Sequence, residues 1–174
     1  MSESLERLGH HVANYAEQER SVIDELSRAF EKSSVPVFQR LQTFPNYVRR
    51  QDISRFLTKY ELFKLSIEAN GSIVECGVFA GGGLFGWLHF SSILEPYNHT
   101  RRIIGFDTFN GFPDIHDKDL SSGMSQHAKV GAFQTSISIK EELEELSNIH
   151  NANRPIGHIQ KIELVKGECL QNDS

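Results

Sequence analysis

An acidic residue and a cluster of glycines follow one another near the middle of the 174-residue chain. Residues 73–83 read IVECGVFAGGG, so that Glu75 precedes Gly77 and Gly81 opens a run of three glycines. A short apolar strand that enters a glycine turn and continues into a helix is typical of α/β proteins that bind nucleotide-like ligands. Glycines let the backbone approach such a ligand closely. The segment is therefore a candidate cofactor site.

The spacing of these residues distinguishes three kinds of ligand. No lysine follows the glycines, as an ATP or GTP site of the form GxxxxGK[ST] requires, and the GxGxxG spacing of dinucleotide sites is broken. The pattern acid-x-Gly-x-x-x-Gly suits a ligand with an ammonium and a carboxylate but no phosphate. Glu75 can face the ammonium, and the backbone amides of the turn can bind the carboxylate. S-adenosylmethionine is such a ligand, and a glycine turn with no ligand is the alternative.

A second acidic residue, Asp107, follows the next apolar run, residues 103–106. Rossmann-like proteins place an acidic residue at this point to accept hydrogen bonds from ribose hydroxyls. Asp107 lies farther from the glycine turn than the ~20 residues usual at dinucleotide sites, and a longer helix with a linker at residues 97–102 explains the excess. A turn-initiating aspartate before Asn110 and Gly111 is the alternative. Because Asp107 occurs in the same pattern as Glu75, the ligand-binding interpretation of Asp107 is favoured.

The pattern of apolar residues predicts the elements that position these side chains. Helical spacing indicates an amphipathic helix over residues 4–30 and a second helix from an N-cap at Asp52 to a stop at Asn70 and Gly71. Residues 33–44 are expected to be irregular because Pro36 and Pro45 interrupt them. Further helices are expected at residues 82–94 and after a capping box formed by Ser138 and Glu141.

Three short apolar runs, residues 73–78, 103–106 and 161–165, are predicted strands. A long polar stretch, residues 108–136, reads as a loop of the kind that often forms a functional lid. Strands that alternate with helices predict an α/β fold with a doubly wound parallel sheet.

The composition excludes several classes of function. The chain is 39% hydrophobic and 24% charged with a net charge of −5, which is ordinary for a globular protein and lacks the basic character that nucleic-acid binding requires. No apolar run approaches the length of a membrane span, and the N-terminus does not resemble a secretory signal. Cys76 and Cys169, the two cysteines, form no CxxC pair, so we expect reduced thiols and a cytoplasmic protein.

Three segments resemble the TylF/MycF family of macrocin-type sugar O-methyltransferases: FPNYVRRQ at residues 44–51, SIVECGV at residues 72–78 and GFDTFNGFP at residues 105–113. The resemblance covers roughly residues 44–168. It implies a Rossmann-like class I methyltransferase fold, S-adenosylmethionine as methyl donor and the hydroxyl of a sugar or related small molecule as acceptor. By motif matching, the cofactor site would be lined by Glu75, Gly77, Phe79, Gly81, Asp107, Thr108, Phe109, Gly167 and Glu168.

The resemblance also implies Mg²⁺ in the full-length domain, held by aspartates that follow a fourth strand. No such aspartate-rich stretch precedes Ser174, so we expect a chain truncated after its third strand, with its catalytic and metal-binding residues beyond Ser174. Residues 1–71 are expected to be a helical extension that makes oligomer and lid contacts, which favours a homo-oligomer. Residues 72–174 are expected to be the first half of the cofactor-binding domain.

The sequence therefore predicts an S-adenosylmethionine-dependent O-methyltransferase that acts on a sugar-like hydroxyl. Two alternatives come from other classes. One is a non-catalytic fragment that binds S-adenosylmethionine or mediates oligomerisation. The other is an NAD(P)-binding oxidoreductase domain, which the broken GxGxxG spacing disfavours.

Overall fold

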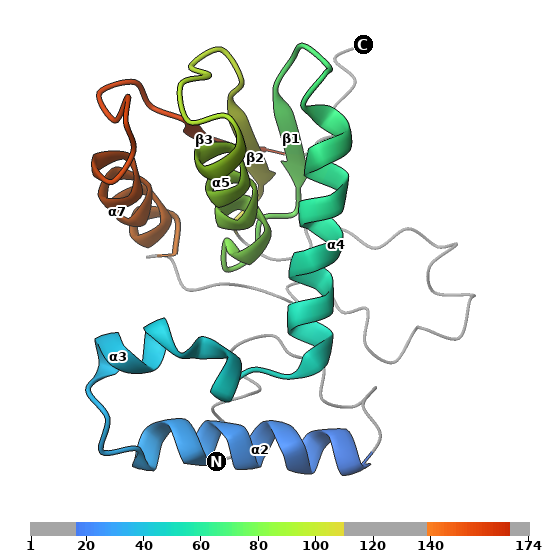
Figure 1. Ribbon diagram of the computed structural model, residues 1–174, viewed down its shortest axis with the longest axis vertical. Helices are drawn as coiled ribbons and strands as arrows, with labels where there is room; N and C mark the ends of the chain where they lie inside the picture. Colours follow the sequence, from blue (N-terminus) through green and yellow to red (C-terminus); the bar gives the residue numbers. More distant parts are fainter. Residues whose placement is uncertain (1–16, 110–138, 168–174) are drawn as a thin grey trace.

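The computed structural model describes residues 17–109 and 139–167. Three parallel strands, β1 (Ile73–Cys76), β2 (Ile103–Asp107) and β3 (Ile162–Lys166), form a sheet in the order β1-β2-β3. Helix α5 (Gly82–Leu94) follows β1, and α7 (Ile139–Ala152) precedes β3 (Figure 1). This arrangement confirms the predicted parallel α/β fold.

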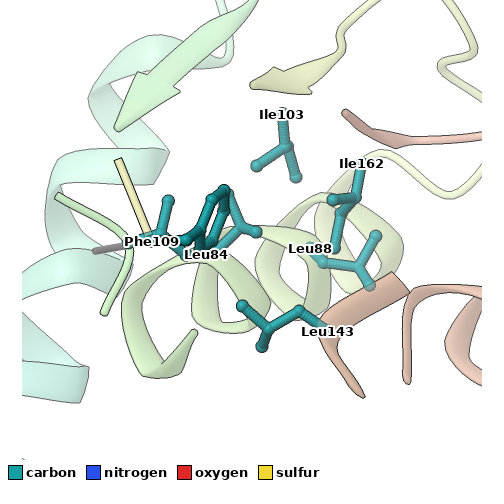
Figure 2. Packing of buried hydrophobic residues seen from close by; sticks show 7 residues of the cluster. Leu84, Leu88, Ile103, Phe109, Leu143 and Ile162 are labelled. Atoms are coloured by element: carbon teal, nitrogen blue, oxygen red, sulfur yellow. The ribbon is translucent and has the colours of Figure 1, made fainter. Parts of the chain in front are cut away.

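The core lies between these two helices and one face of the sheet. Leu84 and Leu88 on α5 meet Leu143 on α7 and the strand residues Ile103 and Ile162 (Figure 2). Burial alternates along β1 and over the first four residues of β2, as expected where one face of the sheet is covered. The core therefore orients the side chains of β1, and it turns every second residue of that strand toward α5.

The helices before β1 are α2 (Glu17–Lys32), α3 (Val37–Gln42), a 3₁₀ turn (Phe44–Asn46) and α4 (Arg50–Ser66). Helix α4 packs against α5, where the rings of Phe56 and Phe63 lie 4.7 and 6.2 Å from the ring of Phe90. The ring of Phe30 on α2 meets Tyr47 edge-on at 5.2 Å. The predicted first helix is confirmed from residue 17 onward, and its earlier part lies outside the described residues.

Two expectations about the prolines and caps of this region were wrong. Residues 33–44 contain α3, because Pro36 precedes its first turn as N-cap, and Pro45 lies at the start of the 3₁₀ turn. Proline is favoured at helix starts, where its missing N–H group is not needed. Helix α4 is capped by Arg49 and not by Asp52. The Asp52 carboxylate accepts hydrogen bonds from the backbone and side chain of Arg49, which lower the pKa of Asp52.

The bounds of α5 agree with the prediction, and the strands differ from their predicted ends by one or two residues. The predicted loop at residues 108–136, apart from its first two residues, and the capping residue Ser138 lie outside the described part. Cys76 is disulfide-bonded, so the expectation of a reduced thiol was wrong there. Among the described residues, no helix is long and apolar enough to cross a membrane, and the cytoplasmic location stays a prediction.

The buried side chain of Arg101 joins α4 to the sheet. Its guanidinium donates hydrogen bonds to the carbonyl oxygens of Ser66, Ala69 and Gly71 at 3.0, 2.8 and 3.1 Å, and to the Glu95 carboxylate at 2.8 Å. Carbonyl groups after a helix have no partners within the helix. Arg101 supplies these partners and so sets the position of α4 beside β1.

Candidate cofactor-binding site

The ends of the three strands are joined by backbone hydrogen bonds. The N–H of Gly77, after β1, donates to Phe106 at 2.8 Å, and the N–H of Gly167, after β3, donates to Asp107 at 3.0 Å. The glycine turn, Asp107 and Gly167 therefore meet at the carboxyl edge of the sheet, as their positions in the sequence predicted. Glu168, the last predicted site residue, lies outside the described residues.

The glycine turn depends on backbone conformations that favour glycine. Gly77 and Gly81 both have φ of 81°, and Gly81 is the left-handed N-cap of α5. A Cβ at Gly81 would lie 2.5 Å from the side chain of Leu143, so this position also lacks room for a side chain. Of the three glycines at the start of α5, Gly81 is buried, Gly83 is half-buried and Gly82 is exposed, so the helix start is open to solvent at Gly82.

The carboxylate of Glu75 lies against this first turn. A Cβ at Gly83 would be 2.0 Å from Glu75 Oε1, which shows how closely the carboxylate approaches the helix. Lys59 on α4 forms an ion pair with the same oxygen at 3.6 Å. The other oxygen, Oε2, is buried and has no hydrogen-bond partner among the described residues. A buried carboxylate oxygen without a partner is costly, so Glu75 retains the capacity to bind a further donor.

Asp107 connects the first two strand ends through its side chain. Its Oδ2 accepts the backbone N–H of Phe79 at 2.9 Å, and its Oδ1 accepts that of Phe109 at 2.7 Å. Phe79 and Phe109 have φ of 50° and 55°, and among the described residues they alone combine a side chain with a positive φ. Asp107 therefore stabilises two strained turns. Each carboxylate oxygen still has a lone pair for a further hydrogen bond.

The turn-forming and ligand-binding interpretations of Asp107 are thus compatible. The bond to Phe109, two residues on, is the local contact that the turn interpretation predicted. The bond to Phe79 crosses to the glycine turn and was not predicted. Thr108, which lies between Asp107 and Phe109 in the chain, is half-buried. Phe109 is 7% exposed and packs in the core. We therefore expect Phe109 to border the site through its backbone.

The residues present fit S-adenosylmethionine. Glu75 offers a carboxylate oxygen for an ammonium group, and the first turn of α5, which is exposed at Gly82, offers the positive end of the helix dipole for a carboxylate. Asp107 can accept a hydrogen bond from a hydroxyl group. The described residues contain no group of three or more His, Cys, Asp or Glu side chains that could hold a metal ion.

One residue of this site, Lys59, could not be predicted from the sequence. On α4 it has the spacing of an ordinary exposed helix lysine, and only the packing of α4 on α5 brings its ammonium to Glu75. A surface depression elsewhere is formed by α7 and β3 and does not include the glycine turn. It is lined by Glu144, Ser147, Asn148, Gln160, Ile162 and Leu164.

Two structures of CalS11 are among the solved structures that resemble this chain. The chain in the crystal structure of CalS11, a calicheamicin methyltransferase, is 30% identical to this chain with a TM-score of 0.83. The match covers 88% of this chain and 59% of the CalS11 chain. An apo structure of CalS11, a TDP-rhamnose 3'-O-methyltransferase of calicheamicin biosynthesis, is 24% identical to this chain with a TM-score of 0.70. The match covers 88% of this chain and 57% of the CalS11 chain. No family model matches the sequence, and no curated protein does.

The described chain has the Rossmann-like fold of a methyltransferase, as predicted. It spans 59% of the first CalS11 chain. Both neighbours are described as methyltransferases, one of them as a TDP-rhamnose 3'-O-methyltransferase, in agreement with the broader part of the sequence prediction. They do not bear on the narrower assignment to TylF/MycF, which stays a prediction.

Proposed function

We propose that this chain is the donor-binding part of an S-adenosylmethionine-dependent O-methyltransferase that acts on a hydroxyl of a sugar or a related small molecule. One observation carries the proposal: in a chain similar to a calicheamicin methyltransferase, Glu75 and the glycine turn meet Asp107 at the carboxyl edge of a parallel sheet. This is the edge at which Rossmann-like proteins bind their ligands.

The residues of this chain bind and orient the donor. S-adenosylmethionine supplies a methyl group on a positively charged sulfur, which an oxygen nucleophile can attack. Glu75 binds the ammonium of the donor's amino acid part. Asp107 accepts hydrogen bonds from the ribose hydroxyls while it keeps the turns at Phe79 and Phe109 in place. Fixing the donor in one orientation lowers the entropic part of the barrier to transfer.

The acceptor is proposed only as a chemical class, a small molecule that carries a hydroxyl group. The described residues offer no carboxylate cluster for Mg²⁺, so no step is assigned to a metal. We also propose that the chain forms a homo-oligomer. The exposed apolar side chains of Val37, Phe38 and Leu41 on α3 are compatible with contact to a second subunit.

Calorimetric titration with S-adenosylmethionine and S-adenosylhomocysteine tests the proposal. We expect binding to the wild-type protein and about tenfold weaker binding to Glu75→Gln, because the neutral amide accepts a weaker hydrogen bond from the ammonium than the carboxylate does. The matched control is Glu61→Gln, an exposed carboxylate on α4 that pairs with Lys64 and should leave the affinity unchanged.

A methyl-transfer assay by mass spectrometry, with nucleotide-linked deoxysugars as acceptors and with Mg²⁺ or a chelator, separates the remaining candidates. Binding with turnover supports the enzyme. Binding without turnover under any condition supports the non-catalytic donor-binding fragment. Absence of donor binding, together with a thermal shift by NAD(H) or NADP(H), would overturn the proposal in favour of an oxidoreductase domain.

A further inference from the structure

The ammonium of Lys59 occupies an unusual position at the start of α5. A Cβ at Gly83 would lie 2.6 Å from Lys59 Nζ, so the ammonium lies against the first turn of the helix. The same group stands over the ring of Trp87 at 4.7 Å from its centroid. The positive end of the helix dipole favours anions at this point and disfavours cations. A lysine is therefore held where the backbone favours a negative charge.

The contact between Lys59 and Glu75 leaves both charges with unused capacity. Their distance of 3.6 Å is longer than a hydrogen bond, and Glu75 Oε2 has no hydrogen-bond partner among the described residues. The side chain of Lys59 is 33% exposed and that of Glu75 is 17% exposed, so neither side chain is sealed from solvent. One positive and one negative group thus lie side by side at the glycine turn, and each can bind a further partner.

We propose that Lys59 binds the carboxylate of the donor's amino acid part while Glu75 binds its ammonium. An amino acid group is a zwitterion, and the pair presents the complementary charges in the same place. Binding exchanges one loose internal ion pair for two ion pairs with the ligand. The first turn of α5 adds its backbone N–H groups to the same carboxylate. This inference rests on the proposed function and extends it to a residue outside the glycine motif.

A different role for Lys59 makes a different prediction. If Lys59 only neutralised and oriented Glu75, its removal would weaken every ligand that carries the ammonium. If it binds the carboxylate, its removal weakens only ligands that carry the carboxylate. Three ligands distinguish the roles: S-adenosylmethionine has both groups, its decarboxylated form has the ammonium alone, and methylthioadenosine has neither.

The experiment is calorimetric titration of these three ligands against the wild-type chain and the variants Lys59→Met, Lys59→Gln and Lys59→Arg. We expect both neutral variants to bind S-adenosylmethionine about tenfold more weakly and the other two ligands within about twofold of wild type. Lys59→Arg should restore most of the affinity because it keeps the charge. Lys64→Met, on the same helix but paired with Glu61, is the matched control and should change nothing.

Melting curves of each variant verify that it folds, and the partly exposed pair predicts only small shifts. Equal weakening of S-adenosylmethionine and its decarboxylated form would overturn the proposal in favour of a positioning role. Unchanged affinity for S-adenosylmethionine would overturn it as well, while leaving the proposed function intact. Failure of the wild-type chain to bind any of the three ligands would overturn both.

Discussion

Gly82 and Gly83 are neighbours in the first turn of α5 that differ in what surrounds them. A Cβ at Gly82 would meet no atom within 4 Å. A Cβ at Gly83 would lie 2.0 Å from Glu75 Oε1 and 2.6 Å from Lys59 Nζ. Gly82→Ala and Gly83→Ala make the same chemical change, the addition of one methyl group. Only Gly83→Ala displaces the two charged groups of the candidate site, Glu75 and Lys59.

The effect on folding should be small for both variants. Alanine in a helix stabilises it by up to ~1 kcal/mol relative to glycine, and we expect Gly82→Ala to gain part of this. In Gly83→Ala the same gain is offset by loss of the ion pair, which contributes ~0–1 kcal/mol when partly exposed. Both displaced atoms end flexible side chains, so the backbone need not move. We expect both variants to melt within a few degrees of wild type.

The effect on donor binding should separate the two variants. With Gly83→Ala the carboxylate of Glu75 cannot stay at the first turn of α5. Loss of a hydrogen bond to a charged group costs ~1.5–3 kcal/mol, so S-adenosylhomocysteine should bind about 10- to 100-fold more weakly. Gly82→Ala leaves Glu75 and Lys59 in place, so it should weaken binding much less than Gly83→Ala does. Calorimetry measures both affinities, and a difference of less than about twofold between the two variants would refute this assignment of Glu75.

Three further predictions concern the residues that hold the site in place. Asp107→Ala removes the acceptor of two backbone hydrogen bonds at 2.9 and 2.7 Å and should lower the free energy of unfolding by ~2–4 kcal/mol in urea titrations; a loss below ~1 kcal/mol would contradict this. Arg101→Met removes a buried guanidinium, leaves the half-buried Glu95 without its closest cation and should cost ~3–5 kcal/mol. Arg102→Met, which breaks an exposed pair, should cost less than ~1 kcal/mol. Burial lowers the pKa of Lys161 from 10.5 to about 8. Between these values the unfolded chain binds a proton that the folded chain does not, so the free energy of unfolding should rise with pH. Lys161→Met should abolish the part of that rise that is due to this group, and a variant that keeps the whole of it would contradict the prediction.

Local patterns predicted the parts of the fold that depend on near neighbours. The bounds of α5 could be predicted because a glycine run precedes it and Pro96 follows its end. Alternation of strands and helices predicted the parallel sheet, which in turn predicted that Asp107 and the glycine turn share one edge. The prolines at residues 36 and 45 were misjudged because a proline marks the start of a helix as readily as its end.

The sequence by itself determined the parallel α/β fold and the glycine turn with its acid, since these follow from composition, periodicity and residues adjacent in the chain. The tertiary structure decided which distant groups meet at that turn. Lys59 reaches Glu75 only because α4 packs on α5, and Asp107 reaches Phe79 only because β1 and β2 are paired in one register. The period of a helix or strand tells which side of it is buried. It does not tell which side chain of another element lies opposite, and at this site that choice brings two complementary charges together.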